Sequence, residues 1–401
     1  MARRPTDGDG IDAITAEQVR ALAVEVLARG VPLGLDGYRY ADADVYQVVV
    51  AAAAPARSVE SVARQLAAAP SANRVRQVLA EHLFAQTDPE ALEAECNRLL
   101  VARLPAGLDR RPHRLAVDLT FIPYHGQPAA EDGEVRRAEA KSGTTHFHCY
   151  ATAYLIRGGR RLTLALAFVR AEDALLDVLA ELLDRVAALG VGVERLLLDR
   201  GFASGAVLAW LQTRPFVSVV ALPRRGARLK ALLTGTTGYR TTYTMESRED
   251  GATTFPLWIA VSYAAGRRGK HGREYLAFGV LGQPPCALPV AGLADEYRSR
   301  FGVESSYRLL NTRRPRTTSR DPALRLLLVA VACLLVNLWV YLKAAVLAAT
   351  PPRLRSTARR WLDAHLRLDA FADLLLEGIK ARWGVHTALT YPFPLTAPVK
   401  L

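Results

Sequence analysis

The sequence has few of the residues that build disulfide scaffolds or zinc sites. Its 401 residues include only four cysteines, which lie far apart and never in a CxxC spacing. The eight histidines form no HExxH pattern, and His146 and His148 are their one close pair. These absences argue against a disulfide framework or a structural zinc site, and favour reduced, mostly buried thiols in a cytosolic protein. We interpret the two histidines as strand-surface residues rather than metal ligands.

Acidic residues are also scarce relative to basic ones. Lysine and arginine number 52 against 39 acids, which gives a net charge of +13, and arginine supplies most of the basic side. Because the guanidinium group binds phosphates as a fork, this excess suggests a polyanionic partner. An arginine- and alanine-rich composition from a GC-rich genome explains the same numbers, so charge alone does not decide between them.

An apolar leader is missing as well, and the chain has one long apolar run. Residues 1–10 are first basic and then acidic with glycines, and they contain no apolar signal core, so we do not expect export. Residues 326–342 are nearly continuously apolar but are interrupted by Asn337. A membrane-spanning helix needs roughly 20 apolar residues, so this slightly short, solitary run is interpreted as a buried helix, and no membrane association is expected.

Residues 1–105 have the spacing of helices joined by short turns. Residues 58–84 read as helix, turn and helix, with Ser58 as an N-cap and apolar residues on one side of each helix. This pattern resembles a helix-turn-helix whose second helix presents Arg74 and Arg76 to a major groove. Any antiparallel helix pair in a bundle gives the same pattern, so that alternative stays open.

The pattern changes after residue 105 to strands alternating with helices. Residues 106–226 predict three strands followed by a helix, a strand, a helix and a strand, which is a mixed α/β sheet. Residues 227–290 have a period of two and predict a β-rich insertion. Helices resume in residues 291–345 and continue through residues 346–401.

Two aspartates follow buried strands in this α/β region. Asp118 comes after the apolar residues 115–117, and Asp199 comes after the apolar residues 196–198. A buried carboxylate is costly unless it is paired or binds a cation, so we expect both to face one divalent metal site. A turn or capping aspartate at each strand end is the ordinary alternative.

The stretch DEYRSRFGVESSYRLLN, residues 295–311, has polar residues at helical spacing. On a helix, the residues that share one face are Tyr297, Arg300, Glu304, Arg308 and Asn311. A solvent-exposed ladder of ion pairs around the glutamate explains part of this pattern. The basic residues that follow suit a phosphate backbone better, and they include Arg313, Arg314 and Arg316.

These motifs together resemble the DDE transposases of the insertion sequence 4 superfamily. The family signature is Tyr, two residues, Arg, three residues, Glu, six residues, Lys; Tyr297, Arg300 and Glu304 match it, whereas Asn311 stands at the lysine position. Asp118 lies in a family-like DLT context, and Asp199 begins DRGF. The resemblance covers roughly residues 110–345.

The resemblance implies a fold, an activity and partners. The fold is α/β, with an RNase H-like mixed-sheet catalytic core that carries a β-rich insertion and follows an all-α N-terminal domain. Asp118, Asp199 and Glu304 would be catalytic and would hold two Mg²⁺ or Mn²⁺ ions that support strand cleavage and strand transfer. The partners would be double-stranded DNA, as transposon ends and target, and a second copy of the chain in a homodimer, in the cytoplasm of a prokaryote at the nucleoid.

Two other function classes remain open from the sequence. A DNA-binding regulator, or an inactive transposase relic, explains the charge and the N-terminal helices but leaves the three ordered acids unexplained. Another RNase H-like nuclease explains the acids, because fold and carboxylates alone do not define the substrate.

Overall fold

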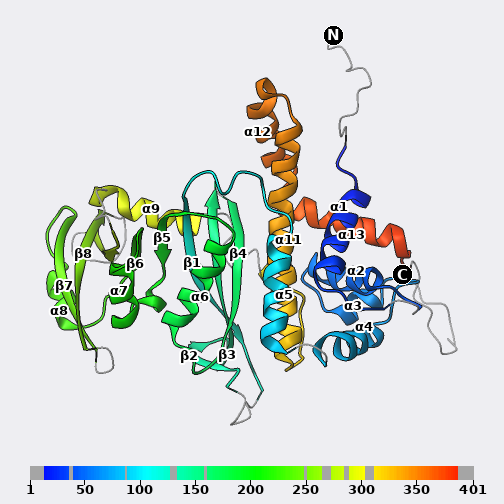
Figure 1. The fold of residues 1–401 in the computed structure, drawn as a ribbon, viewed down its shortest axis with the longest axis horizontal. Coiled ribbons are helices and arrows are strands. Elements are labelled where there is room, and N and C mark those ends of the chain that lie inside the picture. Colours follow the sequence, from blue (N-terminus) through cyan, green and yellow to red (C-terminus); the bar gives the residue numbers. More distant parts are fainter. Residues whose placement is uncertain are drawn as a thin grey trace, which may run out of the picture.

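The computed structural model describes residues 13–35, 39–85, 88–126, 133–157, 160–247, 251–263, 272–283, 289–302 and 311–386, with the side chains of residues 157, 160 and 299–302 excepted. A nine-stranded sheet forms one half of the molecule, and helices from both ends of the chain form the other half (Figure 1). The described fold is therefore α/β with a separate helical region, as the sequence predicts.

Five strands form the centre of the sheet. They are β1 (His113–Pro123), β3 (Thr144–Arg157), β4 (Arg160–Val169), β5 (Val193–Leu198) and β6 (Val217–Ala221). β4, β3 and β1 pair antiparallel, whereas β5 and β6 continue parallel to β1. The short strand β2 (Arg136–Lys141) pairs with the start of β3. This is the mixed arrangement of an RNase H-like core.

The predicted β-rich segment extends this same sheet. β7 (Tyr239–Ser247), β8 (Gly251–Tyr263) and β9 (Arg273–Leu281) pair antiparallel with one another, and β9 also pairs with β6. α8 (Ala227–Leu232) precedes them. The insertion therefore lengthens the sheet beyond β6, on the side away from the helical region (Figure 1).

Helices cover both faces of the sheet. α6 (Leu175–Ala188) and α7 (Gly205–Gln212) bury one face, where Leu179, Leu182 and Leu208 are fully buried. α9 (Val290–Gly302) lies against the other face. The buried apolar residues of α6 recur at helical spacing, which is why its sequence predicts an amphipathic helix.

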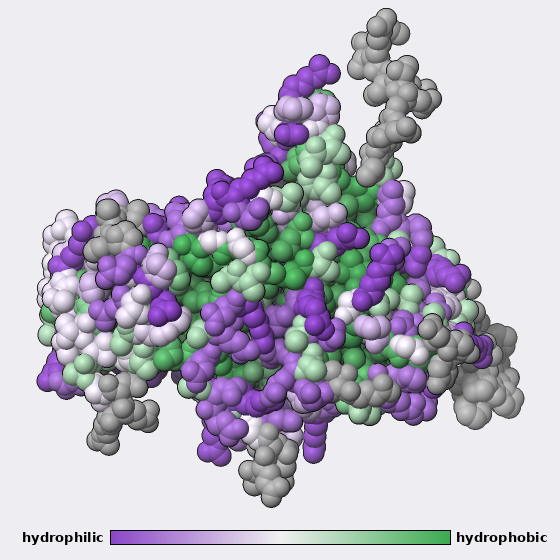
Figure 2. Space-filling view, viewed as in Figure 1, coloured by the Kyte–Doolittle hydropathy of each residue, from purple (hydrophilic) through white to green (hydrophobic). Residues whose placement is uncertain are grey.

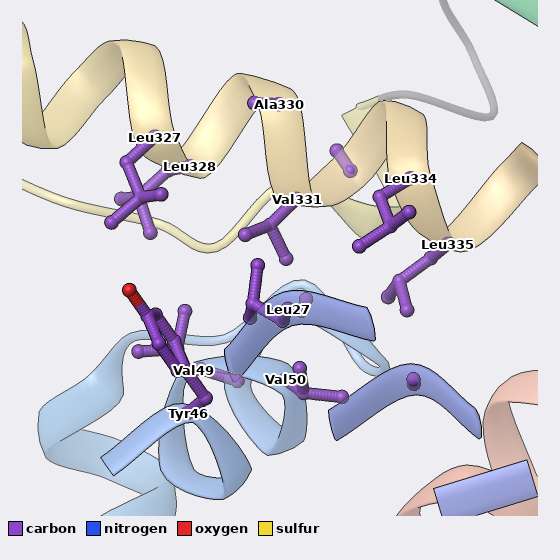
Figure 3. Close-up of a cluster of buried hydrophobic side chains, with 14 of the residues drawn as sticks. Leu27, Tyr46, Val49, Val50, Leu327, Leu328, Ala330, Val331, Leu334 and Leu335 are labelled. Carbon is purple, nitrogen blue, oxygen red and sulfur yellow. The ribbon is translucent and has the colours of Figure 1, made fainter. Parts of the chain in front are cut away.

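Both ends of the chain build the helical region. Its elements are α1 (Ala16–Gly30), α2 (Asp42–Ala53), α3 (Val59–Ala63), α4 (Ala72–Leu79), the π-turn η1 (Ala80–Phe84), α5 (Pro89–Val101), α11 (Pro322–Ala349), η4 (Pro352–Leu354), α12 (Arg355–His365) and α13 (Leu368–Trp383). Leu327, Val331 and Leu334 of α11 point toward Leu27 of α1 and Val50 of α2 in the shared core (Figure 3).

The long apolar helix α11 lies between the two halves of the molecule (Figure 1). Its length and composition would allow it to cross a membrane, yet 83% of its most apolar window is buried inside the protein. It packs mainly among the helices and against the edge strand β4, and so joins the helical region to the sheet. The predicted boundary at residues 345–346 also falls inside this helix.

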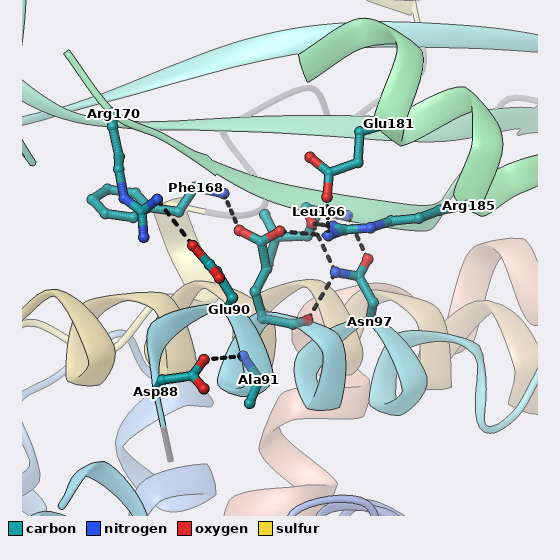
Figure 4. A network of polar contacts seen from close by, with 10 residues as sticks. Asp88, Glu90, Ala91, Asn97, Leu166, Phe168, Arg170, Glu181 and Arg185 are labelled. Carbon is teal, nitrogen blue, oxygen red and sulfur yellow. Dashed lines mark hydrogen bonds and ion pairs between the residues drawn. The ribbon is translucent and has the colours of Figure 1, made fainter. Parts of the chain in front are cut away.

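Polar side chains join the helical region to the sheet (Figure 4). On α5, the Glu93 carboxylate accepts from the Phe168 backbone N–H and from Arg185 of α6, at 2.6 and 2.7 Å. Asn97 exchanges two hydrogen bonds with the Leu166 backbone, each 2.8 Å long. Both residues thereby fix α5 along the edge strand β4.

Hydrophilic residues dominate the lower part of the surface in the view of Figure 2, whereas hydrophobic residues gather along its middle. That middle lies over the junction of the sheet and the helices, where α11 and α5 run (Figure 1).

Candidate active site

Asp118 lies within β1 at the centre of the sheet. Its side chain is 7% exposed, and the Tyr154 hydroxyl of β3 donates to its Oδ2 at 3.5 Å. The Arg161 guanidinium of β4 lies over the Tyr154 ring, 3.9 Å from the ring centroid. A buried carboxylate is costly in an apolar environment, so these polar neighbours and a bound cation are what such a position requires.

Asp199 lies beside Asp118 on the neighbouring parallel strand. Val117 of β1 pairs with Leu198 of β5, so the two aspartates each follow a directly paired residue. Neighbouring strands are about 4.8 Å apart, which brings the two carboxylates to one place. Asp199 also caps the short helix η2 (Arg200–Phe202), because its Oδ1 accepts from the Arg200 N–H at 2.7 Å. Asp199 therefore caps a helix and also lies next to Asp118, so both explanations apply to this residue.

The two aspartates share the sheet face that α9 covers. Val117 and Leu198 face α6 and α7, and successive residues of a strand alternate between faces. The opposite face carries Tyr154 and the α9 residues Leu293 and Tyr297. Asp118 and Asp199 are thus on the side from which the chain continues toward Glu304.

Tyr297 holds α9 beside Asp199. Its hydroxyl donates to the carbonyl of Leu198, 3.2 Å away, and its ring centroid is 4.9 Å from that of Phe278. The family resemblance also implies that Tyr297 contacts DNA; in this structure its side chain is 6% exposed and packs against the sheet. The preceding residue, Glu296, forms ion pairs with Arg195 and Arg114.

The rest of the signature lies mainly outside the described residues. Glu304 and Arg308 are beyond the last described residue of α9, and the Arg300 side chain is likewise outside what the structure describes. Asn311, where the family signature has lysine, is exposed. The third acid is accordingly a sequence prediction, two residues past the end of α9.

The aspartate pair fits a divalent cation by its chemistry. Mg²⁺ and Mn²⁺ bind carboxylate oxygens, and two aspartates from adjacent strands present such oxygens on one sheet face. The part of the chain that the structure describes holds no group of three metal-ligating residues, so a third protein ligand has to come from elsewhere. Glu304 is the predicted third ligand.

The basic segment after α9 divides into buried and exposed arginines. Arg313 is 6% exposed and donates to the carbonyl of Ala54 and to Asp369, so it joins α2 to α13. Burial lowers its pKa from the usual arginine value. Arg313 therefore joins two helices in this structure, and its contact with DNA stays a prediction. Arg314 is half-buried, and Arg316 is exposed while its backbone N–H donates to Arg57.

The predicted helix-turn-helix consists of α3 and α4. Ser58 and Ser71 cap their starts, since their hydroxyls accept backbone N–H groups at 3.1 and 3.3 Å. Arg76 is exposed and pairs with Glu60 at 3.3 Å, whereas Arg74 is half-buried. A cleft of about 550 Å³ separates α4 from the segment around Arg316.

Sequence reasoning missed several polar residues near the aspartates. Tyr154 and Arg161 come from strands whose sequences read only as buried, and Arg161 is 2% exposed. An arginine within the apolar strand segment RRLTLALAFV was the available signal. His148, predicted on a strand surface, is instead 1% exposed beneath the start of α11, because the helical region covers that end of the sheet.

Comparison with known proteins agrees with this geometry. A family model described as a transposase DDE domain matches residues 109–338, more than half of the chain. A solved structure of a piggyBac transposase synaptic complex with hairpin DNA is similar at a TM-score of 0.51 and 10% sequence identity. That alignment covers 96% of this chain and 87% of the other, and it shows a shared RNase H-like fold. No curated protein matches the sequence.

Proposed function

We propose that this chain, which belongs to the transposase DDE domain family, is the transposase of an insertion sequence. The element would be of the insertion sequence 4 type. The protein binds the ends of the element, cuts the DNA strand there and joins the freed 3′ hydroxyl to a second phosphodiester. The observation that carries this proposal is the side-by-side placement of Asp118 and Asp199, on the sheet face that α9 covers.

The chain's own residues would position the reacting groups. Asp118 and Asp199 present carboxylates from rigid neighbouring strands, and Tyr154 orients the first through its hydroxyl. When bound, two Mg²⁺ or Mn²⁺ ions would supply charge stabilisation at the reacting phosphate and activate the attacking oxygen. Glu304, two residues beyond α9 in the sequence, would complete the ligand set. In-line phosphoryl transfer depends mostly on positioning and electrostatics, which a packed sheet supplies.

DNA binding is the other half of the proposed activity. The net charge of +13 and the exposed Arg76 and Arg316 favour contact with the phosphate backbone. Arg74, Arg300, Arg308 and Asn311 are further candidates for DNA contacts. The similar solved structure is a synaptic complex with hairpin DNA, which supports DNA as a partner here. A homodimer on paired DNA ends stays a prediction.

A cleavage assay tests the proposal. The protein is incubated with the flanking DNA ends of its element and Mn²⁺, and strand products are mapped for wild type, Asp118→Asn, Asp199→Asn and Glu304→Gln. We expect all three variants to bind the ends and none to cut them. Asp177→Asn, which removes an exposed carboxylate on α6, is the matched control and should cut normally.

Two results would contradict the proposal. Cutting by Asp118→Asn at the wild-type rate would remove the aspartate pair from the reaction. Tight end binding by wild type without cutting in any divalent metal would favour a regulator or relic over an enzyme.

A further inference from the structure

Three polar side chains, two of them buried and one half-buried, continue the Asp118 face of the sheet beyond the aspartate. Thr120 of β1 pairs with Tyr150 of β3, and Ile122 pairs with His148. Because strand residues alternate between faces, Thr120, Tyr150 and His148 lie on the same face as Asp118. Thr120 is two residues from Asp118, a separation of about 7 Å along the strand.

Two arginines approach this group, Arg325 from the first turn of α11 and Arg314 from the segment before that helix. Arg325 is 8% exposed, and its Nε donates to the Ser319 carbonyl at 2.6 Å, which folds the segment back over the end of β1. Arg314 is half-buried in the same segment. Both arginines interact electrostatically with Tyr150, and burial lowers the pKa of each.

Several atoms of these side chains are buried without a hydrogen-bond partner. They are Thr120 Oγ1, the Tyr150 hydroxyl, both ring nitrogens of His148 and Arg314 Nε. Leaving such a group unsatisfied costs about 1–3 kcal/mol. Five unsatisfied atoms in one place are unusual in a folded protein, and they indicate a ligand that satisfies them.

The charge of the group is also unbalanced. Within the described ranges, neither Arg314 nor Arg325 forms an ion pair with an acid. The nearest acid in sequence, Asp321, uses its carboxylate to cap α11, accepting from Ala323 and Leu324 at 2.9 and 3.2 Å. Two buried guanidinium groups without a carboxylate attract an anion. Thr120 and Arg314 are the half-buried members of the group. The unsatisfied atoms are themselves covered, so a bound phosphate requires these side chains to shift.

We propose that Thr120, His148, Tyr150, Arg314 and Arg325 form a phosphate-binding site for the DNA backbone, next to the carboxylate pair. The bound group is a backbone phosphate close to the one that reacts at Asp118, which rests on the proposed transposase function. The two arginines supply charge and paired N–H donors, while the hydroxyls and one neutral imidazole N–H complete the donor set. This phosphate fixes the position of the strand along β1.

The first experiment uses inorganic phosphate as the probe and the melting temperature of the full chain as the measurement. Phosphate replaces chloride at constant ionic strength, so that only specific binding stabilises the fold. We expect wild type to gain stability with phosphate. Tyr150→Phe removes one unsatisfied hydroxyl, so it should fold at least as stably in chloride and bind phosphate about tenfold more weakly.

Matched arginine variants separate local binding from general charge. Arg314→Gln and Arg325→Gln should lose most of the phosphate effect, whereas Arg359→Gln, an exposed residue of α12 with the same charge loss, should keep it. An equal phosphate effect in wild type, Tyr150→Phe and Arg314→Gln would overturn the site.

The second arm measures DNA binding by the same variants on a duplex of the element's end. Weaker DNA binding by Tyr150→Phe than by Arg359→Gln supports a backbone phosphate. Unchanged DNA binding with a lost phosphate effect would overturn the assignment to DNA and leave a site for free phosphate. A wild type that binds phosphate and DNA through this group but cuts no strand would instead contradict the proposed function alone.

Discussion

The two sides of α11 join it to the rest of the molecule by different physical means. Toward α1 and α2 the contact is mainly apolar, and leucines and valines such as Leu334, Val331 and Leu27 interdigitate (Figure 3). Toward the sheet, Asn337 is 0% exposed; it accepts from the Thr163 N–H at 2.9 Å and donates to the carbonyls of Thr163 and Leu100 at 2.7 and 2.9 Å.

The apolar side of α11 contributes mainly to stability, whereas the Asn337 side determines the position of the helix. Apolar packing is non-directional and tolerates changes that conserve volume. The Asn337 amide satisfies groups of β4 and α5 at once, so it fixes how the helical region sits along the edge of the sheet. That position matters because the residues just before α11 lie over the sheet near Asp118.

The largest expected effect comes from Asn337→Leu. The change conserves size but leaves the Thr163 N–H and two carbonyls buried and unsatisfied, so we expect a loss of about 4 kcal/mol in the free energy of unfolding. Denaturant unfolding followed by circular dichroism measures it. A loss below that of Leu334→Met would show that the two sides of α11 do not differ as described.

On the apolar side, Leu334→Ala should cost about 3 kcal/mol, because it leaves a cavity in the helical core. Leu334→Met, which conserves volume, should cost less than about 1.5 kcal/mol. The same unfolding measurement compares them, and equal costs would mean that this core is loosely packed.

His148 makes the start of the α11 contact sensitive to acid. Burial lowers the pKa of His148 from 6.5 to about 4, so the unfolded chain binds a proton more readily than the folded one between those values. Stability therefore falls as pH drops through this window, by about 2 kcal/mol at pH 5 from this residue. His148→Phe should flatten the stability profile from pH 6.5 to 4, and an unchanged slope would contradict the burial.

The smallest effect is expected where the polar junction is partly exposed (Figure 4). Arg185→Met leaves the Glu93 carboxylate, 12% exposed, without its cation and should cost about 1–2 kcal/mol. Arg98→Gln removes an exposed pair with Glu95 on the same helix as Glu93, and should change stability by less than about 0.5 kcal/mol. Similar losses of stability in both variants would show that the ion pair between Arg185 and Glu93 does not stabilise the junction.

The sequence predicts the strands and the aspartate pair because their signals are local. Asp118 and Asp199 each follow a run of apolar residues, and parallel strands bring such positions together. The amphipathic stripe of α6 and the two-residue period of the β-rich segment are equally local. Each of these elements is found where its pattern indicates.

Long-range contacts explain what the sequence could not predict. Arg313 looks like its exposed neighbour Arg316, and only the packing of α2 and α13 around it decides that it is buried. Tyr297 fits the family signature, yet its hydroxyl reaches Leu198, almost a hundred residues earlier. The apolar sequence of α11 predicts that the helix is buried, but it does not predict which part of the chain covers it.

The pairing of α1 with α13 has a consequence for how the protein is made. These helices approach so closely that a Cβ on Gly378 would lie 2.4 Å from the Ala16 carbonyl oxygen. α1 leaves the ribosome early, but its partner is translated only near the end of the chain. Prematurely terminated chains therefore keep an apolar helix surface exposed, which chaperones and proteases bind. The helical region can therefore assemble only after α13 has been translated.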